Sequence, residues 1–405
     1  MSNKERTKTI SAAAFATMAV GFMIFLIVMA WPAFAKISDL PEFYAAGRMV
    51  LSGNGAQVYD IAQQRAAQHA LFPGMEDRVI GFFVNPFALP MIVPIGWVPV
   101  DAVRYVWKAL LSIALGLSIW LIKRIFELDF RGTLWLIAVM LCSGAAYEAM
   151  RIDQVSSFML CGFCFALWAL KEERPVLAAL GMSVVLLKPQ ELLPMLLFML
   201  GARKYKPLIC LCVLSAILAL IGYCELGTAG MIGYKDLISS TATSAQYLQT
   251  NLSPTLRGQL FLLFPNMKAV GTAISSGVFV VSLGFIYYCG RYFSGSHKWL
   301  QAALLCSMPL GFAASPYFFD YDLLMLVPSL VVLMKEPLQE KIPQWALLLG
   351  MLGSLLFTVP FAVQIHYEYL LKGGTVNPFF WMLLLFSIGV VVFAFKNKQF
   401  FDEYV

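Results

Sequence analysis

Charged residues are scarce in this sequence. Asp, Glu, Lys and Arg make up 13% of the 405 residues, whereas soluble domains carry roughly 25%. The shortage excludes a water-facing surface over most of the chain. Hydrophobic residues make up 60%, which favours a surface that faces lipid.

Histidine is also scarce, and the cysteines show no spacing typical of disulfide pairs. The three histidines, at His69, His297 and His366, are scattered and lack the spacing of a metal site. The eight cysteines lie in or beside apolar runs, without the pattern of a disulfide framework. No basic stripe with interleaved aromatic residues is present. We therefore expect neither a metal, nor another cofactor, nor a nucleic-acid partner.

Apolar runs, in contrast, recur from one end of the sequence to the other. A helix of about 20 apolar residues crosses a bilayer, and only helices or closed barrels satisfy their backbone in lipid. These runs are too long and too uniformly apolar for barrel strands. The sequence predicts an all-α integral membrane protein: a polytopic bundle of about 12 spans, formed by residues 1–405 as a single domain.

The short basic connectors orient these spans, because cytoplasmic loops are enriched in Lys and Arg. We expect both chain ends in the cytoplasm, external loops at about residues 36–83 and 225–267, and a location in the cytoplasmic (inner) membrane. Ser11–Ala35 follows a basic start and is interpreted as an uncleaved first span. Asn85–Trp97 contains three prolines and is interpreted as a half-inserted or interfacial segment. The other expected spans are Ala102–Ile122, Thr133–Ala149, Val155–Leu170, a hairpin of Pro175–Leu187 and Leu192–Leu200, Leu208–Cys224, Ala269–Cys289, Leu300–Ala314, Leu323–Met334, Trp345–Phe361 and Phe379–Phe395.

Ionisable and polar side chains gather at the expected external ends of the spans. Such groups cost several kcal/mol in a membrane, so their presence indicates function. Together they could hold an anionic lipid head group and supply a base. They are Asp39, Glu42, Arg48, Arg151, Asp153, Gln154, Lys188, Glu191, Asp320 and Asp322, with Lys235 and Arg257 in the second loop.

Several short motifs occur in the order found in a known family. They are Asp39–Arg48 (DLPEFYAAGR), Leu51–Asp60, Phe83–Phe87 (FVNPF), Asp153-Gln154, Lys188–Gln190, Asn251–Ser253, Ser315-Pro316 and Tyr321-Asp322. This set resembles glycosyltransferase family 87, the polyprenol-phosphate-mannose-dependent mannosyltransferases with the type C membrane fold. The sequence departs from the pattern at three places: Asp153 stands where a glycine is usual, Asn85 replaces part of a Tyr-Pro-Pro run, and Phe318-Phe319 occupy a stretch that often carries histidine.

The resemblance implies a single inverting displacement at the extracytoplasmic face. A polyprenyl-phosphate sugar, of mannose or a related hexose or pentose, would be the donor, and a lipid or glycan the acceptor. Asp39 would be the catalytic base. Donor phosphate contacts would come from Lys188, Arg151, Gln154 and Arg257, and further substrate contacts from Glu42, Tyr44, Arg48, Asn85, Gln190 and Asp322.

Each leading residue also has a purely structural interpretation. Asp39 could cap a helix that begins at Pro41, and Lys188 could extend to the membrane interface without a ligand. Arg151 could pair with Glu148 or Asp153, and Asp322 could hold a turn at the membrane edge.

Two other functions would also use charges near a lipid path. A transporter or flippase of lipid-linked intermediates is the main alternative, but its ionisable groups are expected near the bilayer midplane. A polysaccharide polymerase or ligase is expected to have a large external loop late in the chain, and this sequence has none. The sequence therefore favours the transferase.

Overall fold

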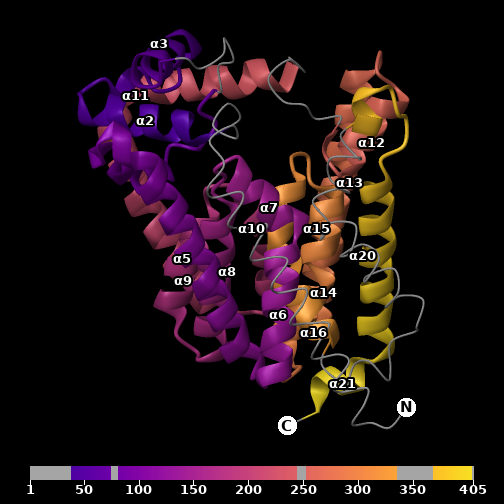
Figure 1. Ribbon diagram of the computed structural model, residues 1–405. Helices are drawn as coiled ribbons and strands as arrows, with labels where there is room; N and C mark the ends of the chain where they lie inside the picture. The colour runs from indigo at the N-terminus through magenta and orange to yellow at the C-terminus, as the bar shows by residue number, and fades with distance from the viewer. Residues whose placement is uncertain (1–37, 74–80, 244–251, 335–367, 404–405) are drawn as a thin grey trace.

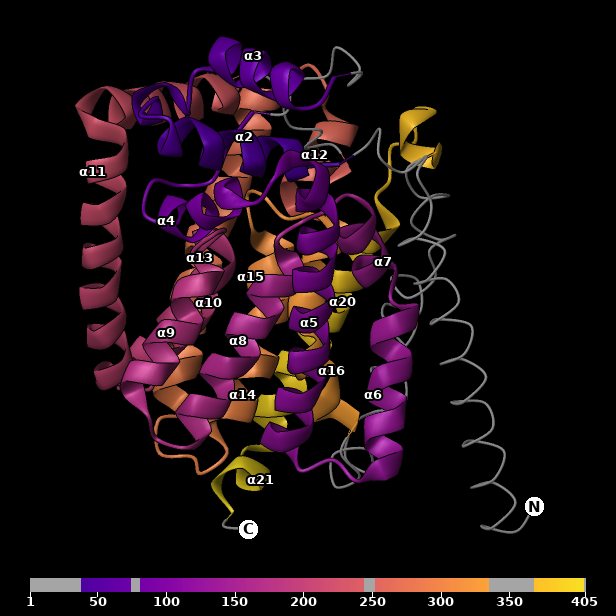
Figure 2. The same cartoon turned by 60° about the vertical axis from the view of Figure 1, so that its left-hand side comes forward.

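The computed structural model describes residues 38–73, 81–243, 252–334 and 368–403. Within these ranges every regular element is a helix. The expected spans Ser11–Ala35 and Trp345–Phe361 lie outside the described residues, as does Asn251. The helices form an upright bundle, with α2, α3 and part of α11 across its upper end and α21 at its lower end (Figures 1 and 2).

The described helices have the following bounds. The first part of the chain contains α2 (Leu40–Leu51), η2 (Gly55–Gln57), α3 (Ile61–Leu71), α4 (Leu89–Ile92), η3 (Val93–Trp97), α5 (Val100–Phe126), α6 (Phe130–Cys142), α7 (Gly144–Arg151), α8 (Ser156–Lys171), α9 (Pro175–Val185), α10 (Pro189–Gly201) and α11 (Tyr205–Thr243). The second part contains α12 (Leu256–Leu263), α13 (Lys268–Tyr292), α14 (Trp299–Cys306), α15 (Met308–Ala314), η5 (Asp320–Leu326), α16 (Val327–Met334), α20 (Pro378–Lys396) and α21 (Lys398–Asp402).

Four of the described helices, α5, α11, α13 and α20, are long and apolar enough to cross a membrane. The pair α6 and α7, bent by 50°, gives a fifth candidate if it is one span. The expected total of about 12 is not reached in this part of the chain, because several expected spans are short or broken helices. The chain is nevertheless a polytopic helical bundle.

The breaks have local causes. The run Thr133–Ala149 is divided at Ser143, whose hydroxyl accepts from the N–H of Ala146, 3.3 Å away, and so starts α7. The run Leu300–Ala314 is divided at Ser307, after which Pro309, which has no N–H, lies in the first turn of α15. The hairpin matches its prediction more closely, because Pro175 and Pro189 each begin a helix.

Helix α11 bends at Gly227, which places a further helix over the bundle. Gly227 has φ +63° and ψ −177°, a conformation essentially restricted to glycine. Residues 228–243 then run across the upper end, beside α2 and α3 (Figures 1 and 2). The external loop expected at 225–267 is thus largely helical in its described part.

Helix α2, in the first expected loop, is fixed on η3 by a close approach of two glycines. A Cβ on Gly96 would lie 2.7 Å from the carbonyl carbon of Gly47, so a larger residue would separate the two elements. The hydroxyl of Tyr44 adds a hydrogen bond to the carbonyl of Val98 at 2.7 Å. These contacts set the position of the first residues of α2, where the candidate site begins.

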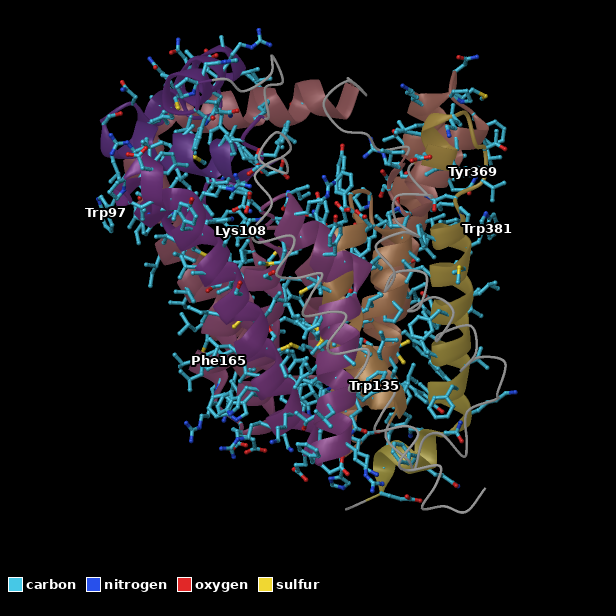
Figure 3. All side chains as sticks on the ribbon, viewed as in Figure 1. Trp97, Lys108, Trp135, Phe165, Tyr369 and Trp381 are labelled. Atoms are coloured by element: carbon cyan, nitrogen blue, oxygen red, sulfur yellow. The ribbon has the colours of Figure 1, made fainter. Side chains whose placement is uncertain are left out.

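Exposed aromatic side chains mark the upper level of the bundle. Trp97 and Trp381 are 71% and 44% exposed, and they lie at similar height on opposite sides in Figure 3. Trp is enriched where a membrane meets water. The placement of Trp97 and Trp381 is consistent with a membrane interface near the level of α2 and α3.

Candidate active site

A cavity of about 470 Å³ opens at the upper end of the bundle. It is bounded by α2, the segment before α4, the start of α10, the second part of α11, α13 and the segment that leads into η5. Its polar and aromatic lining includes Glu42, Asn85, Gln154, Lys188, Gln190, Tyr234, Arg257, Thr272, Ser276, Tyr317, Tyr321 and Asp322.

Asp39 occupies the N-cap position of α2, but its side chain does not cap the helix. Instead the side-chain amide of Gln154, which lines the cavity, donates to the Asp39 carboxylate. The backbone N–H of Asp39 donates to the carbonyl of Ile152 at 2.7 Å, and the N–H of Leu40 donates to Ser38 Oγ at 3.2 Å. The carboxylate is thus held toward the α7–α8 turn at the cavity.

Asp153 fixes the α7–α8 turn through its buried carboxylate. It has φ +64°, the left-handed conformation at a helix end that glycine adopts most readily, which fits its place in a motif where glycine is usual. Its buried carboxylate forms an ion pair with Lys108 of α5 at 2.7 Å and accepts from Ser38 Oγ at 2.6 Å. Figure 3 shows Lys108 in the upper part of α5. This pair connects α5 to both Ser38 and Gln154.

Lys188, the N-cap residue of α10, extends to the segment before α16. Its ammonium lies 2.6 Å from Asp322 Oδ1 and 4.5 Å from the ring centre of Tyr321. Ser156 Oγ donates to the same Asp322 oxygen at 2.6 Å, and the N–H of Phe319 donates to Oδ2 at 3.3 Å. Asp322 therefore holds its own turn and also neutralises Lys188.

Arg257 is a buried cation that, unlike Lys188, has no carboxylate partner among the described residues. Its guanidinium lies 4.7 Å from the ring centre of Tyr317 and 5.3 Å from that of Phe261, and it donates to Thr272 Oγ1 at 3.3 Å. Among the described residues its Nε has no hydrogen-bond partner, and no carboxylate lies within ion-pair distance of the guanidinium. A buried charge of this kind is costly unless an anion joins it.

Two buried carboxyl groups lie near the cations. Burial, together with the Asp39 carboxylate, raises the pKa of Glu42 well above its usual range, although Lys188 opposes the shift. Glu191 is fully buried in the first turn of α10, close to Asp322. In the described part of the chain no three His, Cys, Asp or Glu side chains are grouped so as to hold a metal ion.

The structure separates the sequence candidates into two groups. Glu42, Asn85, Gln154, Lys188, Gln190, Arg257 and Asp322 line the cavity. Arg151 forms an ion pair with Glu148 at 2.7 Å, Arg48 donates to the carbonyl of Gly96 at 3.3 Å, and Tyr44 is bound to Val98. These last three do not line the cavity, and neither does Asp39, which is connected to it through Gln154.

Four further lining residues, Tyr234, Thr272, Ser276 and Tyr317, were not among the candidates from the sequence. Tyr234 reaches the cavity only because α11 bends at Gly227. Thr272 and Ser276, four residues apart, share one face of α13, and this spacing was the available signal. Tyr317 follows the Ser315-Pro316 motif directly.

The bundle and the cavity together define an integral membrane protein whose polar site opens at one end of its helices. Residues 82–316 match the family model of glycosyltransferase family 87, which covers more than half of the chain. The chain belongs to this family and is a membrane glycosyltransferase, with a donor and an acceptor substrate. The matched range includes Gln154, Lys188 and Arg257, whereas Asp39 and Asp322 lie outside it. Comparison with curated proteins gave no match, and comparison with solved structures gave none either.

Proposed function

We propose that this cavity transfers a sugar from a polyprenyl-phosphate donor to a lipid or glycan acceptor at the extracytoplasmic face, with inversion at the anomeric carbon. The observation that carries the proposal is the meeting of carboxylates and cations at one cavity. Glu42, Lys188 and Arg257 line it, and Gln154 connects it to Asp39.

In the proposed step the acceptor hydroxyl attacks C1 of the sugar, and the bond from C1 to the phosphate oxygen breaks. Asp39 takes the proton of the hydroxyl, and the lipid phosphate leaves with the bonding electrons. General base catalysis of this kind contributes about 10²–10⁴-fold. Gln154 supports the role of Asp39, because it lines the cavity and its amide donates to the Asp39 carboxylate.

The leaving phosphate needs positive charge or hydrogen-bond donors. Lys188 was the first candidate from the sequence, but Asp322 already neutralises it. Arg257 is buried in the cavity wall without a carboxylate partner among the described residues. We therefore assign the main phosphate contact to Arg257, with Lys188 as a second cation that the same phosphate can share with Asp322.

The alternative, a transporter or flippase of lipid-linked intermediates, is less well supported. A transporter binds its substrate near the bilayer midplane. Here the cavity lies at the end of the bundle that carries α2 and α3, where Trp97 and Trp381 mark an interface (Figure 3).

The test uses the purified full-length protein with radiolabelled polyprenyl-phosphate sugars and a membrane lipid extract. We expect a new labelled glycolipid with the wild-type protein, and a loss of about 10²-fold or more in rate with Asp39→Asn. Near-normal turnover by Asp39→Asn would contradict the base assignment. Movement of intact donor across a vesicle membrane, without a new glycolipid, would favour the flippase.

A further inference from the structure

A second cavity, of about 420 Å³, lies at the end of the bundle opposite to the candidate active site. It is formed where α8 passes into α9, where α10 passes into α11, and at the start of α14. Figures 1 and 2 show α9 and α14 in the lower part of the bundle, far below α2 and α3. The two cavities therefore face opposite sides of the membrane.

The lining of this lower cavity is strongly cationic. Arg174, Arg203, Lys204 and Lys206 contribute to it, against the single carboxylate of Glu173. In the part of the chain that the structure describes, none of the four cations forms a salt bridge. An anion that enters the cavity thus meets four cations whose charge no ion pair neutralises.

Aromatic rings orient two of these cations. The guanidinium carbon of Arg174 lies 5.5 Å from the ring centre of Trp168, and the ammonium of Lys204 lies 4.7 Å from that of Trp299. Tryptophan and lysine side chains of this kind are typical of the level at which lipid head groups lie.

Apolar surface borders the cavity on the helices that form it. Val176 in the first turn of α9 is 67% exposed, and Ile209 near the start of α11 is 61% exposed. Exposed apolar residues directly beside a cationic cavity match the two parts of a lipid, its phosphate and its acyl chains. A soluble anion would gain nothing from the apolar part.

The backbone at Arg203 decides which substitution removes its side chain without disturbing the turn. Arg203 has φ +60°, and the N–H groups of Arg203 and Lys204 donate to the carbonyls of Leu200 and Met199 at 3.1 and 2.9 Å. This arrangement ends helices most readily with glycine. Arginine is therefore less favourable than glycine in this turn, as is Glu173 with φ +54° in the same lining, so Arg203→Gly removes the cation without disturbing the turn.

We propose that this lower cavity binds the phosphate head group of an anionic membrane lipid in the leaflet opposite to the active site. Basic pockets between spanning helices on the cytoplasmic side bind such head groups, and the basic connectors of the sequence place this end in the cytoplasm. The inference does not depend on the donor or acceptor of the transferase.

The test measures the thermal unfolding of the full-length protein in detergent micelles during titration with short-chain phosphatidylglycerol, with phosphatidylcholine of the same chain length, and with inorganic phosphate. Binding to the folded state raises the Tm with ligand concentration and gives an apparent Kd. For the wild-type protein we expect a saturable rise with phosphatidylglycerol, and at most a small rise with the other two. An equal rise with inorganic phosphate would show a site for soluble anions and would overturn the lipid assignment, as would the absence of any saturable rise.

Arg203→Gly combined with Lys206→Gln is the decisive variant, because glycine relieves the left-handed turn while the two cations are removed. We expect its apparent affinity for phosphatidylglycerol to fall by about 10- to 30-fold, and Arg203→Lys to stay within about threefold of wild type. The matched control is Lys123→Gln with Arg124→Gln at the end of α5, which removes the same charge at the same end of the bundle. Only a small loss is expected there, because neither Lys123 nor Arg124 lines the cavity. An equal loss in the control and the site variant would show general attraction and overturn the proposal.

Discussion

The buried ammonium of Lys108 lies 2.7 Å from the buried carboxylate of Asp153, and the two side chains are 6% and 0% exposed. The pair joins α5 to the α7–α8 turn, and through Ser38 and Gln154 it reaches the candidate base Asp39. The Lys108–Asp153 pair therefore contributes to the stability of the protein and to the position of the Asp39 carboxylate.

We expect Lys108→Met and Asp153→Gly each to destabilise the protein, and the double variant to be more stable than either. Removing one partner of a buried pair costs about 3–5 kcal/mol, whereas replacing both is often nearly neutral. Asp153 has φ +64°, so glycine fits its backbone. Thermal unfolding of the four proteins gives the comparison. A double variant that is the least stable of the four would contradict this account.

Gln154 is expected to act on the catalytic step through Asp39. Gln154→Leu removes the amide that donates to the carboxylate, and the lost orientation is expected to lower kcat by about 10-fold with little change in the KM for the donor. Steady-state kinetics with varied donor measures both constants. A raised KM at constant kcat would instead assign Gln154 to donor binding.

Arg257→Met is expected to weaken donor binding without loss of stability. A hydrogen bond to a charged group contributes about 1.5–3 kcal/mol, which corresponds to a rise of roughly 10- to 150-fold in the donor Kd. The Tm should stay equal or rise, because the buried guanidinium has no carboxylate partner among the described residues. Lys235→Met, at an exposed cation outside the cavity lining, is the control. An unchanged donor Kd in Arg257→Met would remove this residue from the phosphate site.

Glu42 is expected to make stability fall at high pH. Its folded-state pKa is raised by burial, so the folded protein keeps the proton to a higher pH than the unfolded chain. The contribution to stability is complete below about pH 4.3, the ordinary pKa of Glu, and is lost as pH rises through the raised value.

The neutral isostere Glu42→Gln should therefore match wild type near pH 4 and exceed its Tm by about 2 °C or more at pH 8. Tm measured across this range checks the prediction, with the exposed Glu172→Gln as the control. A Tm difference that is the same at both values of pH would contradict it.

Local signals predicted the parts of the fold that depend on single residues. Two short apolar runs between basic connectors predicted a hairpin of Pro175–Leu187 and Leu192–Leu200, and the structure has α9 and α10 there, with α10 beginning three residues earlier, at Pro189. The charged residues of the proposed site were candidates from the sequence because such residues are rare in this chain, and their roles in the reaction stay predictions.

Contacts between distant parts of the sequence could not be predicted in this way. The Lys188–Asp322 pair joins residues 134 positions apart, and no local pattern states that they meet. The bend at Gly227 was also missed, because the expected span ended at Cys224 and Gly227 was placed in an external loop, whereas α11 continues to Thr243. Only the left-handed φ of that residue, set by the packing of the upper helices, reveals the turn of α11.

The bend at Gly227 gives a final prediction, which concerns the two residues that α11 contributes to the cavity lining. Tyr234 and Ile238, from the part of α11 after the bend, line the cavity. Gly227→Ala must place a Cβ in a conformation that costs about 1–3 kcal/mol, a cost that a straighter α11 would relieve. Tyr234 and Ile238 would then leave the cavity, and we expect sugar transfer to fall by about 10-fold or more.

Gly233→Ala is the matched control in the same part of the helix. Its added Cβ meets only the Tyr59 side chain, at an ordinary 3.6 Å, and alanine stabilises a helix interior by about 1 kcal/mol relative to glycine. Transfer rates and Tm of both variants, measured side by side, separate the effect of the bend from the effect of glycine removal. Wild-type activity together with a wild-type Tm in Gly227→Ala would contradict this account, because neither the strain of the bend nor the loss of Tyr234 from the cavity would then be observed.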